Sequence, residues 1–244
     1  MQKTKIEYLD YTWNPLIGCR NWFGGPCGGG SEFKYWAKAM TERFEAHYPF
    51  GFDPTFWPRR IAEPVKLRKP SRIGVSFMGD LFGDWLWAKV VGNPDDMMNM
   101  DEIREAIIGT ARLCPQHTFL FLTKCPWNLR PWNPWPQNAW VGASVTNNGQ
   151  MTIALQHLSQ VKAPVRFISF EPLLGMIGMD DHMPMKGIVE WVITGGKSGK
   201  DKFYPPEDWI QEIESAADGA GVAVFEKDNL RKEWPELPRR EFPR

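Results

Sequence analysis

The sequence has few of the residues that usually build metal centres and none of the long apolar runs that membranes require. Its 244 residues include four cysteines and four histidines. The histidines show no HExxH or other paired-ligand spacing, so the sequence predicts no zinc site. Four irregularly spaced cysteines are too few for a disulfide scaffold of this length, which favours a reducing compartment. No apolar run approaches the roughly 18 residues of a membrane span.

Charge imbalance and a targeting segment are also absent. Lys and Arg total 29, and Asp and Glu also total 29. This balance gives no global argument for binding nucleic acid or an anionic membrane, although it leaves room for a local basic patch. The N-terminal MQKTKIEYLD lacks the apolar core of a signal peptide. We therefore expect a cytoplasmic protein without a membrane partner.

Glycine and cysteine are concentrated in one stretch, residues 14–40. It reads NPLIGCRNWFGGPCGGGSEFKYWAKAM and contains Cys19 and Cys27. The stretch leads into a helix predicted over residues 31–46 from apolar residues at helical spacing. A cysteine pair in a glycine-rich loop before a helix is typical of a place that holds a ligand or a cluster.

Downstream, apolar runs alternate with amphipathic stretches. Strands are predicted at 73–77, 118–122, 140–144, 165–170, 190–194 and 222–225, with a seventh around 7–13, and helices at 103–111, 151–158 and 206–217. This alternation predicts a parallel sheet, and the nearly continuous apolar strands indicate that both of its faces are covered. The preferred fold is a single β/α barrel domain, closed or partly open, spanning residues 1–244. A doubly wound open sheet is the alternative.

Polar residues follow each predicted strand. In parallel sheets ligands bind beyond the carboxyl ends of the strands, so these residues form a candidate site at the barrel mouth. Candidates for catalysis or ligand positioning are Asp80, Lys124, Glu171 and Lys227. Candidates for cofactor binding are Ser144, Gly195, Gly196, Ser198 and Gly199. The competing interpretation is that the charged residues pair with each other, Asp80 with Lys124 and Glu171 with Lys227.

The glycine loop GGKSG at 195–199 follows a predicted strand, as a phosphate-binding loop does. It lacks the full GxxxxGK(S/T) spacing, so it is a weak signal by itself. Its backbone N–H groups could still face an anion or a nucleotide ribose.

Several motifs together resemble one family. They are TWNPLIGC at 12–19, FDPTF at 52–56, EPVKLRKP at 63–70, MGDLFGDW at 78–85, PQHTFLFLTK at 115–124, GASV at 142–145, EPLLG at 171–175, GGKSG at 195–199 and VFEKDNL at 224–230. The chain resembles, nearly end to end, a phage- and prophage-associated family of unknown physiological role that is related to radical-SAM enzymes and carries a three-cysteine motif.

The resemblance implies a β/α barrel whose first loop holds three cysteines. In radical-SAM enzymes three such thiolates bind a 4Fe–4S cluster, and its open iron binds S-adenosylmethionine. One electron from the cluster then generates a 5′-deoxyadenosyl radical that abstracts hydrogen from the substrate. The barrel mouth would hold the adenosine and keep water away.

The sequence departs from this motif in the loop itself. Cys19 matches the first cysteine, and Cys27 could be the second. The third position falls on Gly30, or on Tyr35 if the following helix sets the alignment, and neither is a cysteine. The glycine loop also carries Lys197 where the family usually has an acid.

Three accounts of the cysteines follow. The cluster is lost, and the protein binds a nucleotide-like ligand or a protein partner; or Cys125, just past a strand end, supplies the third thiolate; or the loop cysteines bind another metal or none. Cys114 is expected to be a buried packing residue.

The leading functional hypothesis is a radical-SAM-like phage protein with a degenerate Fe–S motif that binds a nucleotide or adenosyl-type ligand. The first alternative is an active 4Fe–4S and S-adenosylmethionine enzyme acting on a nucleotide or nucleic acid. The second is a protein that binds nucleic acid or a partner without catalysis, through the Trp/Pro segment 126–136 and the Lys and Arg residues of 59–72.

Overall fold

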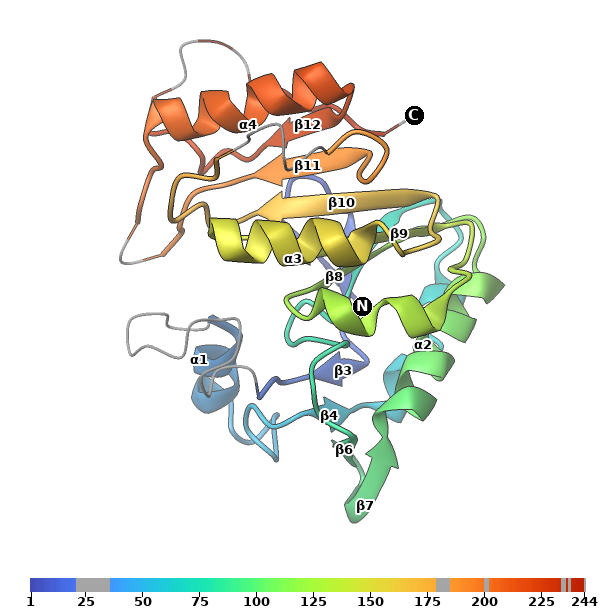
Figure 1. Ribbon diagram of the computed structural model, residues 1–244. Helices are drawn as coiled ribbons and strands as arrows, with labels where there is room; N and C mark the ends of the chain where they lie inside the picture. The colour runs from blue at the N-terminus through green and yellow to red at the C-terminus, as the bar shows by residue number, and fades with distance from the viewer. Residues whose placement is uncertain (21–35, 179–184, 200–201, 234–235, 237, 244) are drawn as a thin grey trace. The chain divides into compact units, whose positions relative to one another are not determined.

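The structure, a computed structural model, describes residues 1–20, 36–178, 185–199, 202–233, 236 and 238–243 (Figure 1). The chain divides into two compact units. The first consists of Met1–Asn128 and Trp135–Ala139, and the second of Leu129–Pro134 and Trp140–Arg244.

The larger sheet is open. Its strands are β1 (Gln2–Lys3), β2 (Tyr11–Trp13), β5 (Arg72–Val75), β8 (Thr118–Thr123), β9 (Ala139–Ser144), β10 (Val165–Phe170), β11 (Trp191–Thr194) and β12 (Ala223–Glu226). They follow the order β1-β2-β5-β8-β9-β10-β11-β12, and no pairing among the described strands joins β12 back to β1. The predicted barrel is therefore wrong. The order also follows the chain from β2 to β12, without the reversal of a doubly wound sheet.

Short segments occupy the outer edges of the two end strands. At one end β1 pairs antiparallel with β2. At the other end the chain after residue 238 runs antiparallel to β12, with a bridge between Phe225 and Arg240. The Glu241 N–H donates to the Val224 carbonyl at 3.0 Å. The outer edges of β2 and β12 are therefore already hydrogen-bonded, so neither strand presents an unpaired edge along these residues.

The first unit contains a second sheet that the sequence pattern did not predict. Its strands are β3 (Leu16–Ile17), β4 (Thr55–Phe56), β6 (Trp87–Val90) and β7 (Asn93–Asn99). They follow the order β3-β4-β6-β7, with β4 and β6 parallel and the other neighbours antiparallel. In the larger sheet, β2, β5 and β8 of this unit are parallel, as predicted.

The helices of the first unit are α1 (Trp36–Arg43), α2 (Met100–Leu113) and the short 3₁₀ helices η1 (Pro58–Arg60), η2 (Pro64–Lys66) and η3 (Pro126–Asn128). The Asn99 side chain caps α2 by accepting a hydrogen bond from the Asp101 N–H at 2.8 Å. The predicted apolar face of α2 is buried. Helix α1 differs, because Trp36, Met40 and Phe44 on its apolar stripe are exposed.

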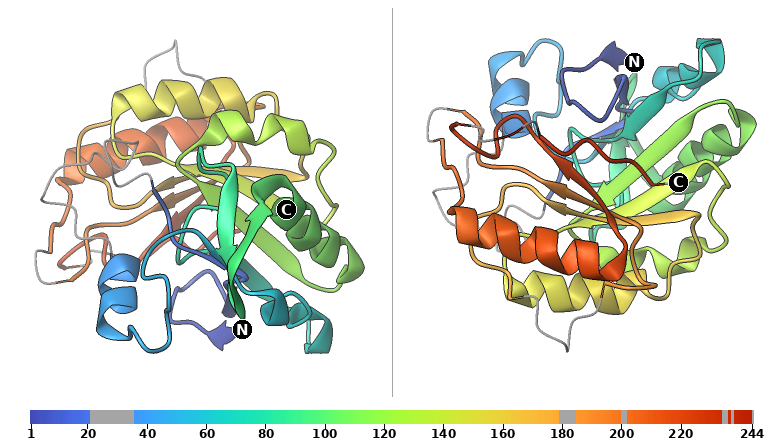
Figure 2. Two further views of the ribbon diagram at one scale, coloured as in Figure 1. Left: turned by 90° about the horizontal axis from the view of Figure 1, so that it is seen from below. Right: turned by 90° about the horizontal axis from the view of Figure 1, so that it is seen from above.

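In the second unit, β9 to β12 are parallel neighbours in register. The helices are η4 (Arg130–Trp132), α3 (Asn148–Leu158) and α4 (Glu207–Ala220). Figure 2 shows α3 and α4 on the same face of these strands, as right-handed connections between consecutive parallel strands require. Helix α4 ends at Gly221, whose φ of 69° is the left-handed conformation that favours glycine. Within the described ranges, no helix has the length and apolar character needed to cross a membrane.

Candidate functional site

The residues predicted for catalysis and cofactor binding lie at or just beyond carboxyl ends of strands, but they belong to two units. In the first unit, Asp80 and Lys124 follow β5 and β8. In the second unit the candidates are Ser144, Glu171, the loop 195–199 and Lys227. The two sets differ in how fully their polar atoms are engaged by the protein itself.

Asp80 is buried, and its carboxylate accepts three hydrogen bonds. Oδ1 accepts from the Phe82 N–H at 3.0 Å and from Thr123 Oγ1 at 2.7 Å, and Oδ2 accepts from the Lys124 N–H at 2.9 Å. Burial raises the pKa of Asp80, and these hydrogen bonds oppose the rise because they favour the ionised carboxylate. Asp80 therefore ties the turn after β5 to the end of β8.

The predicted pairing of Asp80 with Lys124 thus occurs through the backbone of Lys124. No carboxylate of the described residues lies within ion-pairing distance of the Lys124 ammonium. The side chain of Lys124 is half-buried. Of these two residues, it is Lys124 whose charged group, the ammonium, could bind a ligand.

Asp84 organises the segment after β8. Its Oδ1 accepts hydrogen bonds from Trp127 Nε1 at 2.9 Å and from Asn128 Nδ2 at 2.7 Å. Its Oδ2 lies 3.9 Å from Sγ of the buried Cys125. The Cys125 N–H in turn donates to Thr123 Oγ1 at 2.9 Å. These contacts order residues 125–128, at the start of the Trp/Pro segment 126–136, and the two hydrogen bonds to Asp84 Oδ1 lie at the surface.

Cys19 is buried at the end of the segment that follows β3. Its N–H donates to the Phe52 carbonyl at 3.1 Å. The preceding Gly18 forms a parallel bridge with Gly79, the neighbour of Asp80. Because Asp80 also binds the Lys124 N–H, the segments carrying Cys19 and Cys125 meet at the same strand ends.

The other predicted metal ligand, Cys27, lies outside the described residues, as do Gly30 and Tyr35. Within the described part of the chain, no group of three or more His, Cys, Asp or Glu residues is placed to hold a metal ion. Cys114 is buried, as predicted for a packing residue, and burial raises the pKa of its thiol. Of the three candidate thiolates, the structure therefore describes only those of Cys19 and Cys125.

In the second unit, the buried Lys227 forms an ion pair with Glu171. The interpretation that these two residues compensate each other is thereby confirmed. A Cβ atom on Gly195 would lie 3.2 Å from both Glu171 Cγ and Lys227 Cδ. Gly195 thus allows the ion pair to pack closely against the backbone after β11.

Asn229 holds the glycine loop in place. Its Nδ2 donates to the Gly196 carbonyl at 2.8 Å and to Ser198 Oγ at 2.7 Å. A Cβ atom on Gly196 would lie only 2.4 Å from the Asn229 carbonyl oxygen and 2.6 Å from that of Phe203. Only glycine fits at position 196 without moving the backbone.

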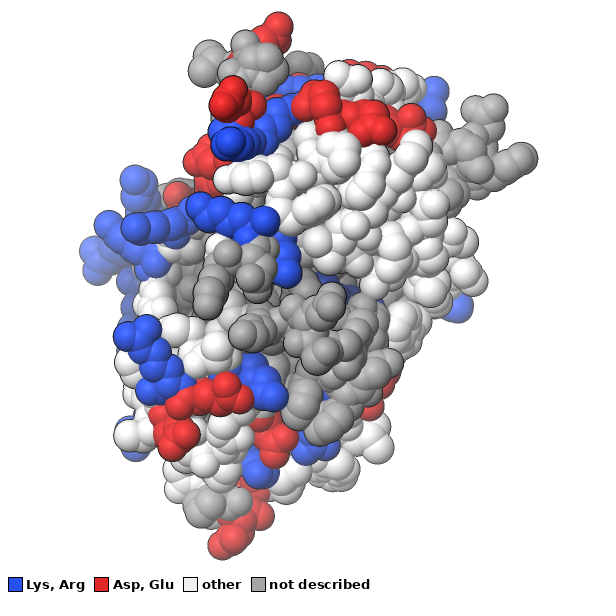
Figure 3. Space-filling model, turned by 90° about the vertical axis from the view of Figure 1, so that its left-hand side faces the viewer, with Lys and Arg blue, Asp and Glu red and all other residues white. Residues whose placement is uncertain are grey.

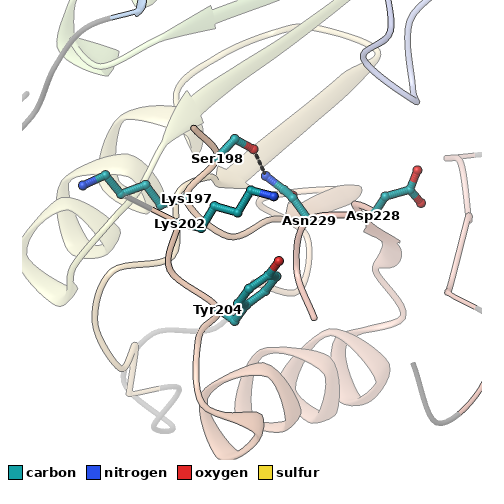
Figure 4. A pocket seen from close by; sticks show the side chains of 6 residues that line it. All are labelled: Lys197, Ser198, Lys202, Tyr204, Asp228 and Asn229. Atoms are coloured by element: carbon teal, nitrogen blue, oxygen red, sulfur yellow. Dashed lines mark hydrogen bonds between the residues drawn. The ribbon is translucent and has the colours of Figure 1, made fainter. Parts of the chain in front are cut away.

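A pocket of about 250 Å³ opens beside this loop. Its lining residues are Lys197, Ser198, Lys202, Tyr204, Asp228 and Asn229. In Figure 4 the Lys202 ammonium and the Tyr204 hydroxyl point toward the hydrogen-bonded Ser198 and Asn229, whereas Lys197 and Asp228 extend to opposite sides. The lining therefore includes two lysines and several hydrogen-bonding groups, and of the two ammonium groups it is that of Lys202 that points at Ser198 and Asn229.

Asp228 contributes little uncompensated negative charge to this pocket. Its carboxylate forms an ion pair with Arg240. Neither Lys197 nor Lys202 has a carboxylate partner among the described residues. The pocket consequently favours an anionic group.

A family model for proteins of unknown function, DUF5131, matches residues 3–235. The chain belongs to the DUF5131 family. No curated protein and no solved structure matches the chain. The matched region includes every residue that lines the pocket.

In this DUF5131 protein, sequence reasoning found part of the pocket and missed the rest. Ser198 was predicted, whereas Lys202, Tyr204, Asp228 and Asn229 were not. Asn229 and Asp228 belong to the VFEKDNL motif, so that motif carried a usable signal. Ser144, also predicted, pairs in register with Ser169 and is not among the pocket-lining residues.

Proposed function

We propose that this DUF5131 protein binds a nucleotide or adenosyl-type ligand in the pocket beside the glycine loop 195–199. The observation that supports the proposal best is the set of pocket groups: two lysines without carboxylate partners in the described chain, next to Ser198, Tyr204 and Asn229. Ammonium groups together with hydroxyl and amide groups suit a phosphate attached to a sugar. Figure 3 views the side toward which the strands β10 and β11 point in Figure 1, and both Lys or Arg and Asp or Glu side chains are visible there.

The size of the pocket indicates which part of the ligand it holds. At about 250 Å³ it is slightly smaller than the roughly 300 Å³ at the lower end of small-molecule sites. A phosphate and ribose would therefore occupy it, with the base outside. Tyr204 is 38% exposed at the rim, and its ring offers a surface on which a base can stack.

The charge of the pocket ranks the candidate ligands. Nucleoside phosphates carry the negative charge that Lys197 and Lys202 favour, whereas S-adenosylmethionine carries a positive sulfonium. We therefore expect nucleoside phosphates to bind more tightly than S-adenosylmethionine or S-adenosylhomocysteine.

Isothermal titration calorimetry with ATP, AMP, S-adenosylmethionine and S-adenosylhomocysteine tests this function. The double variant Lys197→Ala/Lys202→Ala should weaken nucleotide binding by about tenfold or more, since each charge-assisted hydrogen bond contributes about 1.5 kcal/mol or more. The matched control is Lys162→Ala/Lys186→Ala, which removes two exposed lysines of the same unit outside the pocket lining. Absence of heat with all four compounds, or equal loss in both double variants, would contradict the proposal.

We also propose that the protein descends from phage-associated radical-SAM proteins and carries a degenerate form of their cysteine motif. A 4Fe–4S cluster of this type requires three thiolates. The described residues supply only Cys19 and Cys125 near the relevant strand ends, and no three ligating groups come together there. The described residues therefore supply two of the three thiolates that such a cluster needs.

The alternative of an active cluster enzyme depends on Cys27 joining the other two cysteines. The convergence of the Cys19 and Cys125 segments favours testing it. Anaerobic reconstitution with iron and sulfide, followed by iron analysis of the wild type and of Cys19→Ala, Cys27→Ala and Cys125→Ala, is the direct experiment. Iron retained by the wild type and lost in all three variants would support the enzyme. A colourless wild type without bound iron would exclude it.

A further inference from the structure

A second feature, in the first unit, is a run of cations at the amino ends of β5 and β8. The segment 59–69, which includes η1 and η2, and the last turn of α2 precede these strands. Exposed basic residues here and on β1, which pairs with β2, are Lys3, Arg59, Lys66, Arg68, Lys69 and Arg112. We call these six residues the basic surface.

The structure fixes the backbone of this surface. The ring of the buried His117 hydrogen-bonds the Leu67 carbonyl, with Nε2 at 2.9 Å. Gln116 Nε2 donates to the same carbonyl at 3.3 Å. Ser71 Oγ donates to the Lys69 carbonyl at 2.9 Å. Because the carbonyl groups face inward to these donors, the segment presents Lys66, Arg68 and Lys69 to solvent.

The cations of the basic surface form no ion pairs within the described part of the chain. Among the described residues, none of the six has a carboxylate within ion-pairing distance. The nearest acid in sequence, Glu63, pairs with the N-terminal ammonium of Met1. Asp10 accepts a hydrogen bond from the Arg72 N–H at 2.8 Å. In a chain of zero net charge, this concentration of one sign is a local field that attracts a polyanion.

We propose that the basic surface binds the phosphate backbone of nucleic acid without sequence preference. Arginine and lysine side chains on a fixed backbone can contact successive phosphates, and arginine can do so through two hydrogen bonds. Binding of this kind releases counterions, so it weakens steeply as salt rises.

An anionic membrane is a poorer match for the same residues. Membrane-surface binding normally uses an amphipathic helix that buries a continuous apolar face. The large apolar side chains exposed among these segments are Val65 and Leu113, and Val65 belongs to a 3₁₀ turn of three residues. The basic surface therefore has no apolar face that could insert into a bilayer. This favours nucleic acid over an anionic membrane as its ligand.

Fluorescence anisotropy with labelled single-stranded and duplex oligonucleotides of mixed sequence tests the proposal. The wild type should bind both at about 50 mM NaCl and lose most of its affinity by about 200 mM. The triple variant Lys66→Ala/Arg68→Ala/Lys69→Ala should weaken binding by about tenfold or more at low salt. It should also reduce the slope of log affinity against log salt by roughly 2 to 3.

The matched control is Lys162→Ala/Lys186→Ala/Lys232→Ala, which removes three exposed lysines from the second unit. It has the same net charge as the test variant and should bind like the wild type. If circular dichroism shows the test variant to be unfolded, Arg68→Gln replaces it, with an expected fall in slope of about 1.

Three results would overturn the proposal. They are no binding by the wild type at low salt, equal binding by the test and wild-type proteins, and equal weakening by test and control variants. Binding to phosphatidylserine vesicles together with no nucleic-acid binding is a further contradicting outcome. The proposal is independent of the nucleotide pocket, because Lys197→Ala/Lys202→Ala leaves the basic surface intact.

Discussion

One sequence pattern, polar residues after predicted strands, indicated functional residues both after β5 and β8 and after β11 and β12. The two groups have different roles in the structure. Asp80 in the first unit has three hydrogen-bond donors around it and is buried. Lys202 in the second unit is exposed in a pocket and has no carboxylate partner among the described residues. A polar residue at a strand end can thus stabilise the turn that follows or face a ligand, and its hydrogen bonds decide which.

The largest effect on stability should come from removing the buried Asp80 carboxylate in the first unit. Asp80→Ala would leave the N–H groups of Phe82 and Lys124 and the Thr123 hydroxyl without their acceptor. We expect the free energy of unfolding to fall by about 3 kcal/mol, because buried donors would lose their partner. Urea denaturation measures this loss.

Asp228→Ala provides the control for Asp80→Ala, because it removes an exposed carboxylate from the pocket of the second unit. We expect it to change the free energy of unfolding by less than about 0.5 kcal/mol. Similar losses in the two variants would show that Asp80 is not the structural residue that its hydrogen bonds indicate.

The next effect concerns the glycine loop 195–199, which borders the pocket of the second unit. Gly196→Ala would place a Cβ atom within 2.6 Å of two backbone carbonyl oxygens. The loop must shift, so we expect a loss of about 2 kcal/mol in stability together with weaker nucleotide binding. Thermal unfolding and calorimetry measure the two effects.

Gly219→Ala is the matched control for Gly196→Ala. It lies in α4, where a Cβ atom would meet nothing within 4 Å. Since alanine favours helix, we expect a gain of about 0.5 kcal/mol and unchanged nucleotide binding. If Gly219→Ala also weakened nucleotide binding, the loss in Gly196→Ala could not be assigned to the altered glycine loop.

The last predicted effect is a pH dependence of stability in the second unit. Arg231 contacts Glu207, Glu214 and Glu226. Burial, followed by the neighbouring Glu226, raises the pKa of Glu214 from 4.5 to about 7. The folded protein therefore binds more protons than the unfolded chain between these two values. Its free energy of unfolding should fall as pH rises through this window, by roughly 2 kcal/mol.

Glu214→Gln removes the titrating group and should flatten this part of the pH profile. Glu212→Gln, on the same helix, is the control and should keep the wild-type slope. Urea denaturation at several pH values between about 5 and 8 measures the difference. A slope that persists in Glu214→Gln would assign the proton uptake to another group.

The parallel strands β5 and β8 to β12 of the larger sheet were predictable because each contains a short apolar run, such as TFLFL in β8. The segments that pair with the outer edges of β2 and β12 were not, since β1 and the chain near Arg240 show no strand pattern of their own. The second sheet was missed for a similar reason. β7 has the sequence NPDDMMN, which lacks any alternation of apolar and polar residues.

The candidate site was predictable to the extent that it follows strand ends. The pairing of Glu171 with Lys227 could be anticipated from opposite charges beyond neighbouring strands. The pocket could not, because Lys202 and Tyr204 come from the connection between β11 and α4, whose path no periodic pattern defines. Nor could the sequence show that Asp80 would use the backbone of Lys124 rather than its ammonium.

The pairing of the chain near Arg240 with β12 has a practical consequence for work with the family. The family match ends at residue 235, whereas the segment that covers β12 lies beyond it. A chain shortened at that boundary would expose the N–H and C=O groups of an apolar strand, and such edges promote self-association. It would also remove Phe242, whose ring packs against Trp191 and Phe225. A shortened chain should therefore aggregate in light-scattering measurements under conditions in which the 244-residue chain stays monodisperse.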